Sequence, residues 1–388
     1  MSLRILVAPS GFKESLGADE AADRIEAGIL RALPDAVVHK APLVDGGEGF
    51  AIALAVATGG TVHQVSVTGP VGQSVASHFG ILGGDGERTA VLEMAAAAGL
   101  RLVPTEVRDP LVTTTYGVGE LISAALDAGA ERILVGCGDS GTNDGGAGMA
   151  QALGVRLLDS AGEDVGSGGG ELARLERIDV SERDRRLEVV DIEVACNWHN
   201  VLCGENGVAR VFGPQKGASS ETVETLACAL DRYADVIERD LGLDVRSIPG
   251  GGASGGLGAG LYALLGAKLY PRYEVVMRFL DLDDRLGETD LVITAEGAVD
   301  FQTPRGKIPA EVADRARKYG VPVIALAGTL GRDYQLNYEH GIAAMASILV
   351  APVSLAEAIE NAGPLLEDCA ERVVRLICVG QQLGQRTG

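Results

Sequence analysis

Three short acidic segments contain the side chains best suited to phosphate or metal chemistry. The first is Asp45-Gly46-Gly47-Glu48-Gly49, and similar carboxylate and glycine groupings recur at 143–146 and 296–300. Glycine has no Cβ and reaches positive φ without steric cost, so such loops can bring a carboxylate close to a ligand. A solvated turn is the alternative for any single loop, because short acidic glycine motifs often occur by chance. Their recurrence favours a ligand site with five candidate carboxylates: Asp45, Glu48, Asp144, Glu296 and Asp300.

The first lysine of the chain follows a predicted strand. Residues 3–8 (LRILVA) form a short apolar run rich in branched side chains, which is typical of a buried parallel strand. In open α/β sheets, ligands bind beyond the carboxyl ends of the strands. Lys13 lies in the loop after this run, where it could hold a phosphate or could be an ordinary surface lysine.

A glycine-, serine- and threonine-rich loop follows another predicted strand. Residues 132–136 predict the strand, 138–148 the loop and 149–153 a helix. In this arrangement, backbone N–H groups and a helix N-terminus can face an anion. The loop has this layout but does not match the common phosphate-binding motifs. The candidate phosphate- or nucleotide-binding residues are Ser140, Thr142, Asn143 and Gly145.

The densest glycine stretch of the chain, residues 249–260, leads into a predicted helix at 261–265. It could cradle phosphates through Gly255, Gly256 and Gly258. The alternative is a flexible hinge between domains, and both functions could coexist.

Composition excludes several classes of protein. The chain has 33 Lys plus Arg against 54 Asp plus Glu, and a net charge of −21 argues against nucleic acid or an anionic membrane as partner. No apolar run approaches the length of a membrane span, and the N-terminus lacks a signal-peptide layout, so we expect a cytoplasmic protein. The six cysteines form no C-x-x-C pair, and the apolar neighbours of Cys228 and Cys378 suggest buried thiols.

Length and texture indicate two domains. A chain of 388 residues exceeds the usual size of one hydrophobic core. Alternating βα patterns occupy residues 1–68 and 268–388, whereas 62–94 predict short antiparallel strands. We therefore predict an α/β fold: a discontinuous, doubly wound parallel-sheet domain (1–68 and 268–388) interrupted by a mixed α/β insert (69–267) with glycine-rich loops. A single long helix is predicted at 354–379.

Taken together, the motifs resemble the bacterial glycerate kinase type I family over nearly the whole chain. The resemblance rests on the order and spacing of segments 8–16, 45–49, 113–116, 142–148, 214–217, 255–260 and 296–307. It implies transfer of the γ-phosphoryl group of ATP to a hydroxyl of D-glycerate, usually giving 2-phosphoglycerate, with Mg²⁺. It also implies two α/β domains, one of them flavodoxin-like, with the active site in the cleft between them, and a homodimer is possible.

Phosphoryl transfer requires cations at the phosphates, carboxylates for Mg²⁺ and a group that positions the attacking hydroxyl. On this basis we expect catalytic roles for Lys13, Asp45 and Asp300, and metal binding by Asp144 and Glu296. The acceptor and its phosphate would be bound by a further set of residues: Ser10, Glu48, Phe50, Asn197, Arg305 and Lys307.

Several positions depart from the family pattern. Ser10-Gly11 replaces Asp-Ser, Asn197-Trp198 replaces Asp-Val, and Ala298 stands where the family has a basic residue. Phe50 replaces a threonine beside the first acidic loop, and Ala295 replaces a glycine. Loss of a cation predicts weaker binding of a carboxylate substrate, for which Arg305 could compensate. Another hydroxy acid or a polyol is therefore an alternative acceptor, and a non-catalytic nucleotide- or metabolite-binding regulator is the alternative from another class.

Overall fold

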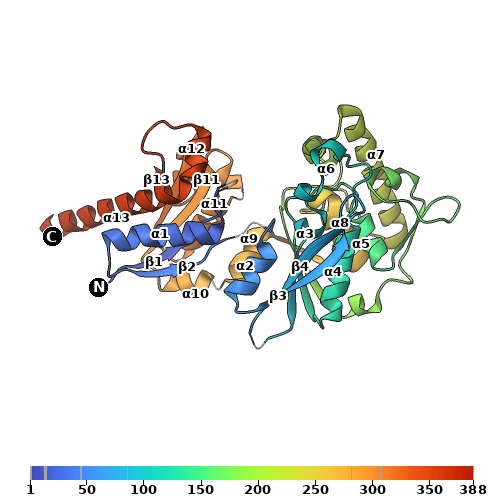
Figure 1. Ribbon diagram of the computed structural model, residues 1–388, viewed down its shortest axis with the longest axis horizontal. Coiled ribbons are helices and arrows are strands. Elements are labelled where there is room, and N and C mark those ends of the chain that lie inside the picture. Colours follow the sequence, from blue (N-terminus) through green and yellow to red (C-terminus); the bar gives the residue numbers. More distant parts are fainter. Residues whose placement is uncertain are drawn as a thin grey trace. The chain divides into compact units, whose positions relative to one another are not determined.

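The computed structural model describes residues 2–12, 15–43, 46–84, 86–280, 282–305 and 307–387, with only the backbone of 279, 305 and 384–387. The chain divides into two compact units (Figure 1). The first unit comprises 1–44 and 276–388, and the second comprises 45–275.

The first unit is built on a five-stranded parallel sheet. The strands are β1 (Arg4–Val7), β2 (Val37–Lys40), β11 (Leu291–Val299), β12 (Val323–Leu330) and β13 (Ile342–Ser347). Their order is β13-β12-β11-β1-β2, which is the flavodoxin order when the strands are counted along this unit. The helices are α1 (Ala18–Ala32), α10 (Leu282–Gly287), α11 (Ile308–Lys318), α12 (Leu355–Glu360) and α13 (Ala362–Thr387). The predicted doubly wound, flavodoxin-like sheet is thus confirmed.

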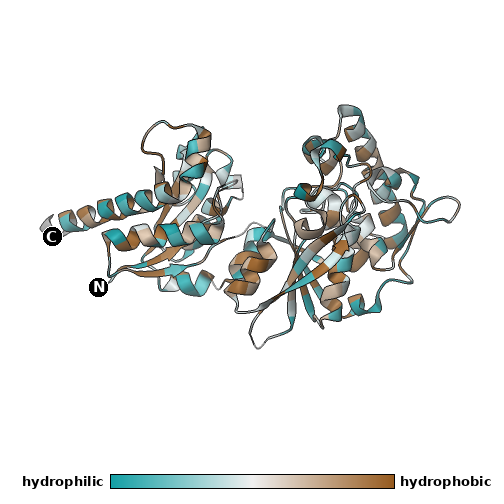
Figure 2. Cartoon of the chain, viewed as in Figure 1, coloured by the Kyte–Doolittle hydropathy of each residue, from teal (hydrophilic) through white to brown (hydrophobic). Residues whose placement is uncertain are grey.

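The core of this unit lies between the sheet and the helices α1 and α13. Ile5 and Val7 of β1 are fully buried, as expected for a parallel strand covered on both faces. Along α1 and α13, hydrophobic and hydrophilic residues alternate (Figure 2), so each helix has one apolar side to bury. The two helices approach closely at Gly28, where a Cβ would lie 2.2 Å from the carbonyl oxygen of Glu367. The predicted single helix at 354–379 is instead two helices, which meet at Asn361.

Strands β1 and β11 are neighbours at the point where the strand order reverses. The chain leaves β1 toward β2 on one side and leaves β11 toward β12 on the other. The loops after these two strands therefore diverge at their carboxyl ends, which is the usual ligand position in such sheets. Two hydrogen bonds join the loop after β1 to strand β11: Thr294 Oγ1 donates to Ala8 O (2.8 Å), and Ser10 N donates to Ala295 O (2.8 Å).

The second unit contains a six-stranded mixed sheet. Its strands are β3 (Thr61–Thr68), β4 (Ser74–Ile81), β5 (Thr89–Glu93), β6 (Arg132–Gly136), β9 (Asp191–Cys196) and β10 (Lys268–Pro271). The order is β10-β9-β6-β5-β4-β3; the first four strands are parallel, and β4 and β3 are antiparallel. The antiparallel strands expected at 62–94 are confirmed, but the parallel βα pattern continues beyond them. A small hairpin pairs β7 (Arg156–Leu158) with β8 (Arg177–Asp179).

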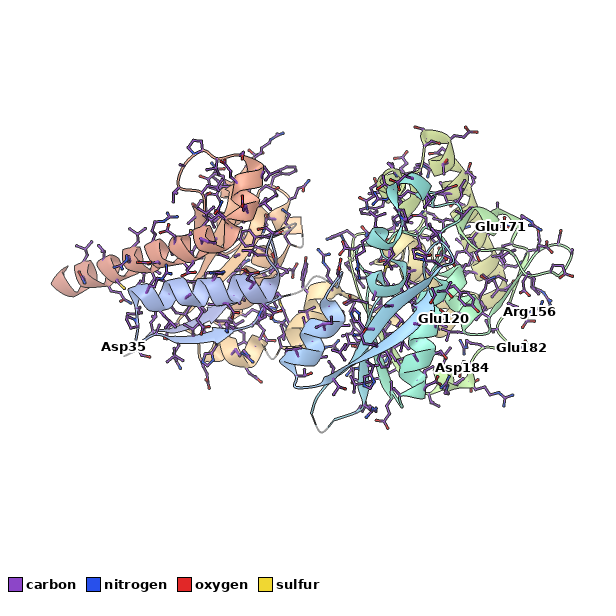
Figure 3. The ribbon with its side chains drawn as sticks, in the orientation of Figure 1. Asp35, Glu120, Arg156, Glu171, Glu182 and Asp184 are labelled. Atoms are coloured by element: carbon purple, nitrogen blue, oxygen red, sulfur yellow. The ribbon has the colours of Figure 1, made fainter. Side chains whose placement is uncertain are left out.

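Helices of very different length cover this sheet. They are α2 (Phe50–Ala57), α3 (Ala95–Ala98), α4 (Tyr116–Asp127), α5 (Ala147–Ala152), α6 (Val208–Phe212), α7 (Ser220–Leu241), α8 (Ala253–Leu265) and α9 (Arg272–Phe279). Helix α2 is hydrophobic throughout (Figure 2). Acidic side chains such as Glu171, Glu182 and Asp184 lie at the periphery of this unit (Figure 3), where solvent screens part of the negative charge. No helix of the described segments is both long and apolar enough to cross a lipid bilayer.

The unit boundaries differ from the expected ones at residues 68 and 268. The contacts divide the chain after Val44 and after Val275, within α9. Strand β3 belongs to the second unit because it pairs with β4 along its whole length. Helix α2 packs on β4, the partner of β3: a Cβ at Gly80 would lie 2.9 Å from both Ala51 O and Ala55 Cβ. A strand-to-helix texture alone cannot show which sheet a strand joins.

The two glycine-rich segments of the second unit interlock. Gly145 N donates to Gly255 O (3.0 Å). A Cβ at Gly255 would lie 1.9 Å from Thr142 O, and one at Gly256 would lie 2.9 Å from Gly145 Cα. Gly258 is likewise closed off, since its Cβ would lie 2.3 Å from Gly250 O. All these glycines are buried, so they allow the two segments to pack closely, and a phosphate-binding role for Gly145, Gly255, Gly256 and Gly258 stays a prediction.

We predict that Gly255→Ala destabilises the protein by about 3 kcal/mol or more, because the new Cβ meets backbone and φ is +72°. Gly242→Ala is a matched control, with the same φ of +72° but no atom within 4 Å of its Cβ. The control should lose only about 1 kcal/mol, the cost of the left-handed conformation. Urea unfolding measures both, and equal losses would contradict the interlocked packing.

Candidate active site

Each unit carries a set of polar residues at the carboxyl ends of its parallel strands. In the second unit, the set surrounds the loop 46–49, which lies over the ends of β6 and β9. A Cβ at Gly46 would lie 3.4 Å from Ala195 O, and one at Gly138 would lie 2.7 Å from Gly47 Cα. Gly46 and Gly49 have φ of +80° and +87°, which L side chains rarely adopt. The glycines in this motif therefore let the loop turn tightly against the sheet.

Glu48 is the exposed end of this loop. Its Oε1 lies 3.0 Å from Nε of Arg101, and its backbone N–H donates to Asp139 Oδ2 (3.2 Å). Both side chains of the Glu48–Arg101 pair are about half exposed, with 55% and 50% of their surface accessible, so the pair contributes little stability. Sequence reasoning missed Arg101 and Asp139. The glycine-rich loop after β6 pointed to Asp139, whereas nothing in the motifs pointed to Arg101.

Phe50, the first residue of α2, is fully buried. Its ring lies against Gly136, where a Cβ would come within 2.5 Å of Phe50 Cδ1. The buried Glu93 carboxylate accepts hydrogen bonds from Gly49 N (3.1 Å) and Ala51 N (2.9 Å), which fixes the start of α2. The ring therefore packs in the core, and a role for Phe50 at the acceptor site stays a prediction.

The most unusual group of the second unit is Lys216, which sequence reasoning did not select. It ends a short 3₁₀ helix (Pro214–Lys216) and is 2% exposed. Its Nζ donates to three oxygens of the loop after β6: Ser140 Oγ at 2.9 Å, Thr142 O at 2.6 Å and Asn143 Oδ1 at 3.3 Å. Burial lowers the pKa of Lys216 to about 7, although the charge of Asp144 opposes that shift. In the sequence, its position in the Gly-Pro-Gln-Lys-Gly segment (213–217) is the feature that could have drawn attention to Lys216.

Asp144 is fully buried beside this loop. Oδ2 accepts from Thr115 N (2.8 Å), Thr115 Oγ1 (2.9 Å) and Gly148 N (3.3 Å), and Oδ1 accepts from Gly146 N (3.2 Å). Burial raises the pKa of Asp144, and these hydrogen bonds oppose the rise. With both oxygens engaged by protein donors, Asp144 organises the loop, and metal binding by Asp144 stays a prediction.

The other predicted residues of this loop are buried as well. Ser140, Thr142 and Asn143 are 8%, 0% and 0% exposed. Within the described residues, Thr142 Oγ1 and Asn143 Nδ2 are buried atoms without a hydrogen-bond partner. A role for these side chains in nucleotide binding remains a prediction.

Asn197 follows β9 at the same edge of the sheet and is half-buried. Its Oδ1 accepts from His199 N (3.1 Å), which forms a local turn. Trp198 beside it is 38% exposed. Of the cysteines expected to be buried, Cys228 is exposed, whereas Cys378 is half-buried and packs against the core of the first unit.

In the first unit, a lysine lies between two carboxylates at the end of β11. Lys307 Nζ is 3.4 Å from Asp300 Oδ1 and 4.0 Å from Glu296 Oε1, and it donates to Ala298 O (3.1 Å). Asp300 Oδ1 also accepts from Gln302 N (2.9 Å). Ser10, from the loop after β1, donates its hydroxyl to Ala295 O (3.1 Å). The connection from β11 to α11 thus brings together three residues that the sequence predicted: Glu296, Asp300 and Lys307.

Two predicted catalytic residues, Lys13 and Asp45, lie outside the described residues, as does the side chain of Arg305. In the described part of the chain, no group of three or more His, Cys, Asp or Glu side chains is arranged to hold a metal ion. Mg²⁺ commonly binds through one or two carboxylates together with substrate phosphates. Glu296 and Asp300 provide two such carboxylates beside Lys307.

We predict that Lys216 makes stability depend on pH. Between pH 7 and its ordinary pKa of 10.5, Lys216 is largely neutral in the folded protein but protonated in the unfolded chain. The unfolded state then binds more protons, so the free energy of unfolding should rise with pH by up to about 1.4 kcal/mol per unit relative to Lys216→Met. Urea unfolding of both proteins from pH 7.5 to 9.5 measures this difference. Parallel pH dependences would contradict it.

The comparisons with known proteins agree over nearly the whole length. Residues 5–378 match the model of the glycerate kinase family. Glycerate kinase of Bacillus subtilis is 49% identical over 375 residues, covering 97% of this chain and 98% of that protein. Glycerate 2-kinase of Escherichia coli is 46% identical over 380 residues, covering 98% and 99%. A solved structure from Salmonella typhimurium LT2, described as a candidate glycerate kinase 2, has a TM-score of 0.85 at 47% identity and covers 98% of this chain and 100% of that one. The chain belongs to the glycerate kinase family.

Proposed function

We propose that this protein transfers the γ-phosphoryl group of ATP to D-glycerate, at the 2-hydroxyl. The proposal rests on membership of the glycerate kinase family over the full chain, together with the cluster of Lys307, Asp300 and Glu296 at the strand-order reversal. The relative from Escherichia coli is named a 2-kinase, which supports the choice of hydroxyl. Nothing in the cluster favours a regulator over an enzyme, since its three charged groups are all present.

The roles in the first unit follow from charge and geometry. Lys307 is a compact cation on a partly exposed side chain, so we assign it to a phosphate group of the nucleotide or product. Glu296 and Asp300 would hold Mg²⁺, which when bound neutralises charge on the phosphates. Lys307 limits repulsion between these two carboxylates before the ligands arrive.

The remaining predicted residues keep their assignments as proposals. Ser10, Glu48, Asn197 and Arg305 remain assigned to glycerate, and Lys13 and Asp45 to the transfer step. Ala298 removes a cation that the family usually has. Besides Arg305, we assign Arg101, which forms an ion pair with Glu48, as a source of positive charge for the acceptor carboxylate.

The direct test is turnover by the full-length protein with ATP, Mg²⁺ and D-glycerate. We expect ADP and 2-phosphoglycerate in equal amounts, with loss of activity on chelation of Mg²⁺ and recovery on its return. Phosphorus NMR distinguishes the 2-phosphate from the 3-phosphate. Tartronate, erythronate and simple polyols form the comparison set. Faster turnover of one of these would replace glycerate as acceptor, and nucleotide binding without any turnover would favour the regulator.

We expect Lys307→Met and Asp300→Asn each to lower kcat/KM by about 100-fold or more, because the first removes a cation at the phosphates and the second removes a proposed ligand of Mg²⁺. Lys318→Met is the matched control, since this exposed lysine ends the helix α11 that follows Lys307. The control should keep wild-type kinetics. Thermal unfolding of all variants should stay within a few degrees of wild type, and losses that merely follow unfolding would remove the assigned roles.

A further inference from the structure

We propose that Lys216 is a positioning residue for phosphoryl transfer: its buried side chain keeps the Ser140 hydroxyl available as a hydrogen-bond donor to an anionic ligand. This inference rests on the proposed kinase function and goes beyond it, because it gives a role to a residue outside the predicted site.

The hydrogen-bond pattern around Nζ carries the argument. An ammonium group has three donors and no acceptor, so each of its three oxygen neighbours must accept. Ser140 Oγ is one of these acceptors, at 2.9 Å. Its own O–H is therefore not used by Lys216 and can donate elsewhere. Thr142 O and Asn143 Oδ1 take the other two donors, which fixes the direction of the lysine side chain.

The backbone around Ser140 is held from both sides. Leu100 N donates to Asp139 O (2.8 Å), and Gly141 N donates to Ala98 O (2.9 Å). The Asp139 carboxylate, next in the chain, accepts from Glu48 N at the exposed loop. Ser140 thus lies one residue from the exposed part of the candidate site, and its 8% exposure shows that the side chain is nearly but not completely enclosed.

A change in the charge of Lys216 would reverse this arrangement. The neutral amine has two N–H donors and one lone pair, so Ser140 would then donate its O–H to Nζ. Burial lowers the pKa of Lys216 to about 7, which places the change in an accessible range. Asp144 of the loop favours the charged form, and Tyr233 of α7 is the other titratable group beside Asp144. Arg108, whose carbonyl oxygen packs against Gly217, lies on the remaining neighbouring segment.

The competent state is accordingly the charged one. Activity should be highest when Lys216 is protonated and should decline as the pH rises through the pKa of Lys216. A lysine that only stabilised the fold would change the amount of folded enzyme, without linking the pH profile to Ser140.

A double-mutant cycle tests the coupling, using Lys216→Met, Ser140→Ala and the double variant in the full chain. At pH 6.5 we expect each single variant to lose about 10- to 100-fold in kcat/KM, and the double variant to lose no more than the worse single one. The basic limb of the wild-type pH profile should be absent from both single variants. Lys268→Met, an exposed lysine of β10 paired with Asp191, is the control and should match wild type at every pH.

The outcomes separate the two proposals. Losses that multiply in the double variant, or a basic limb retained in Ser140→Ala, would overturn the positioning role. If Lys216→Met does not fold, as judged by circular dichroism, the pH profile of Ser140→Ala still decides the matter. An inactive wild-type protein would count against the proposed function, which is a different result from an active enzyme with independent effects.

Discussion

Burial of the Lys216 ammonium group is the constraint on which the polar half of the second unit depends. A charge removed from water must be met by acceptors, because an unpaired buried charge costs several kcal/mol. Three oxygens from Ser140, Thr142 and Asn143 meet it here, which requires the loop after β6 to turn its polar groups inward. Asp144 supplies the compensating negative charge and is itself held by four donors. The conformation of the loop is therefore set by its buried contacts with Lys216 and by the hydrogen bonds to Asp144.

The glycines of the second unit follow from the same arrangement. The loop passes close to its neighbours: a Cβ at Gly255 would lie 1.9 Å from Thr142 O, and one at Gly145 would lie 2.6 Å from Tyr233 Cε1. The exposed side chains at this edge include Glu48, Arg101, Asp139 and Trp198. In the first unit, charge is arranged differently, because Lys307 is only partly buried and lies between two carboxylates that are partly open to solvent. Lys216 of the second unit is buried and holds the loop after β6 in place, whereas Lys307 of the first unit is partly exposed and can contact a ligand.

Membership of the glycerate kinase family explains why the charged residues of its motifs are retained. The positions that depart from the family pattern have different structural surroundings. Phe50 changes the core beneath α2, since its ring uses the space left by Gly136. Asn197 keeps a polar side chain at the end of β9. Ala298 contributes only its carbonyl oxygen, which accepts from Lys307. The substitutions thus differ in kind, and they do not all bear on the acceptor.

The sequence by itself determined the family, the alternation of strands and helices in the first unit, and the carboxylates Glu296 and Asp300 with Lys307, because hydrophobic period and motif order are properties of the chain. Only the tertiary structure decided which strands share a sheet, and it assigns β3 and α2 to the second unit instead of the first. It also decided burial: Asp144, Phe50 and Gly255 have the types and spacing of site residues but face inward. The physical reason is that a motif specifies which atoms can donate, accept or approach, whereas their partners come from segments distant in the chain. Lys216 shows this most clearly, since its three acceptors lie more than 70 residues away.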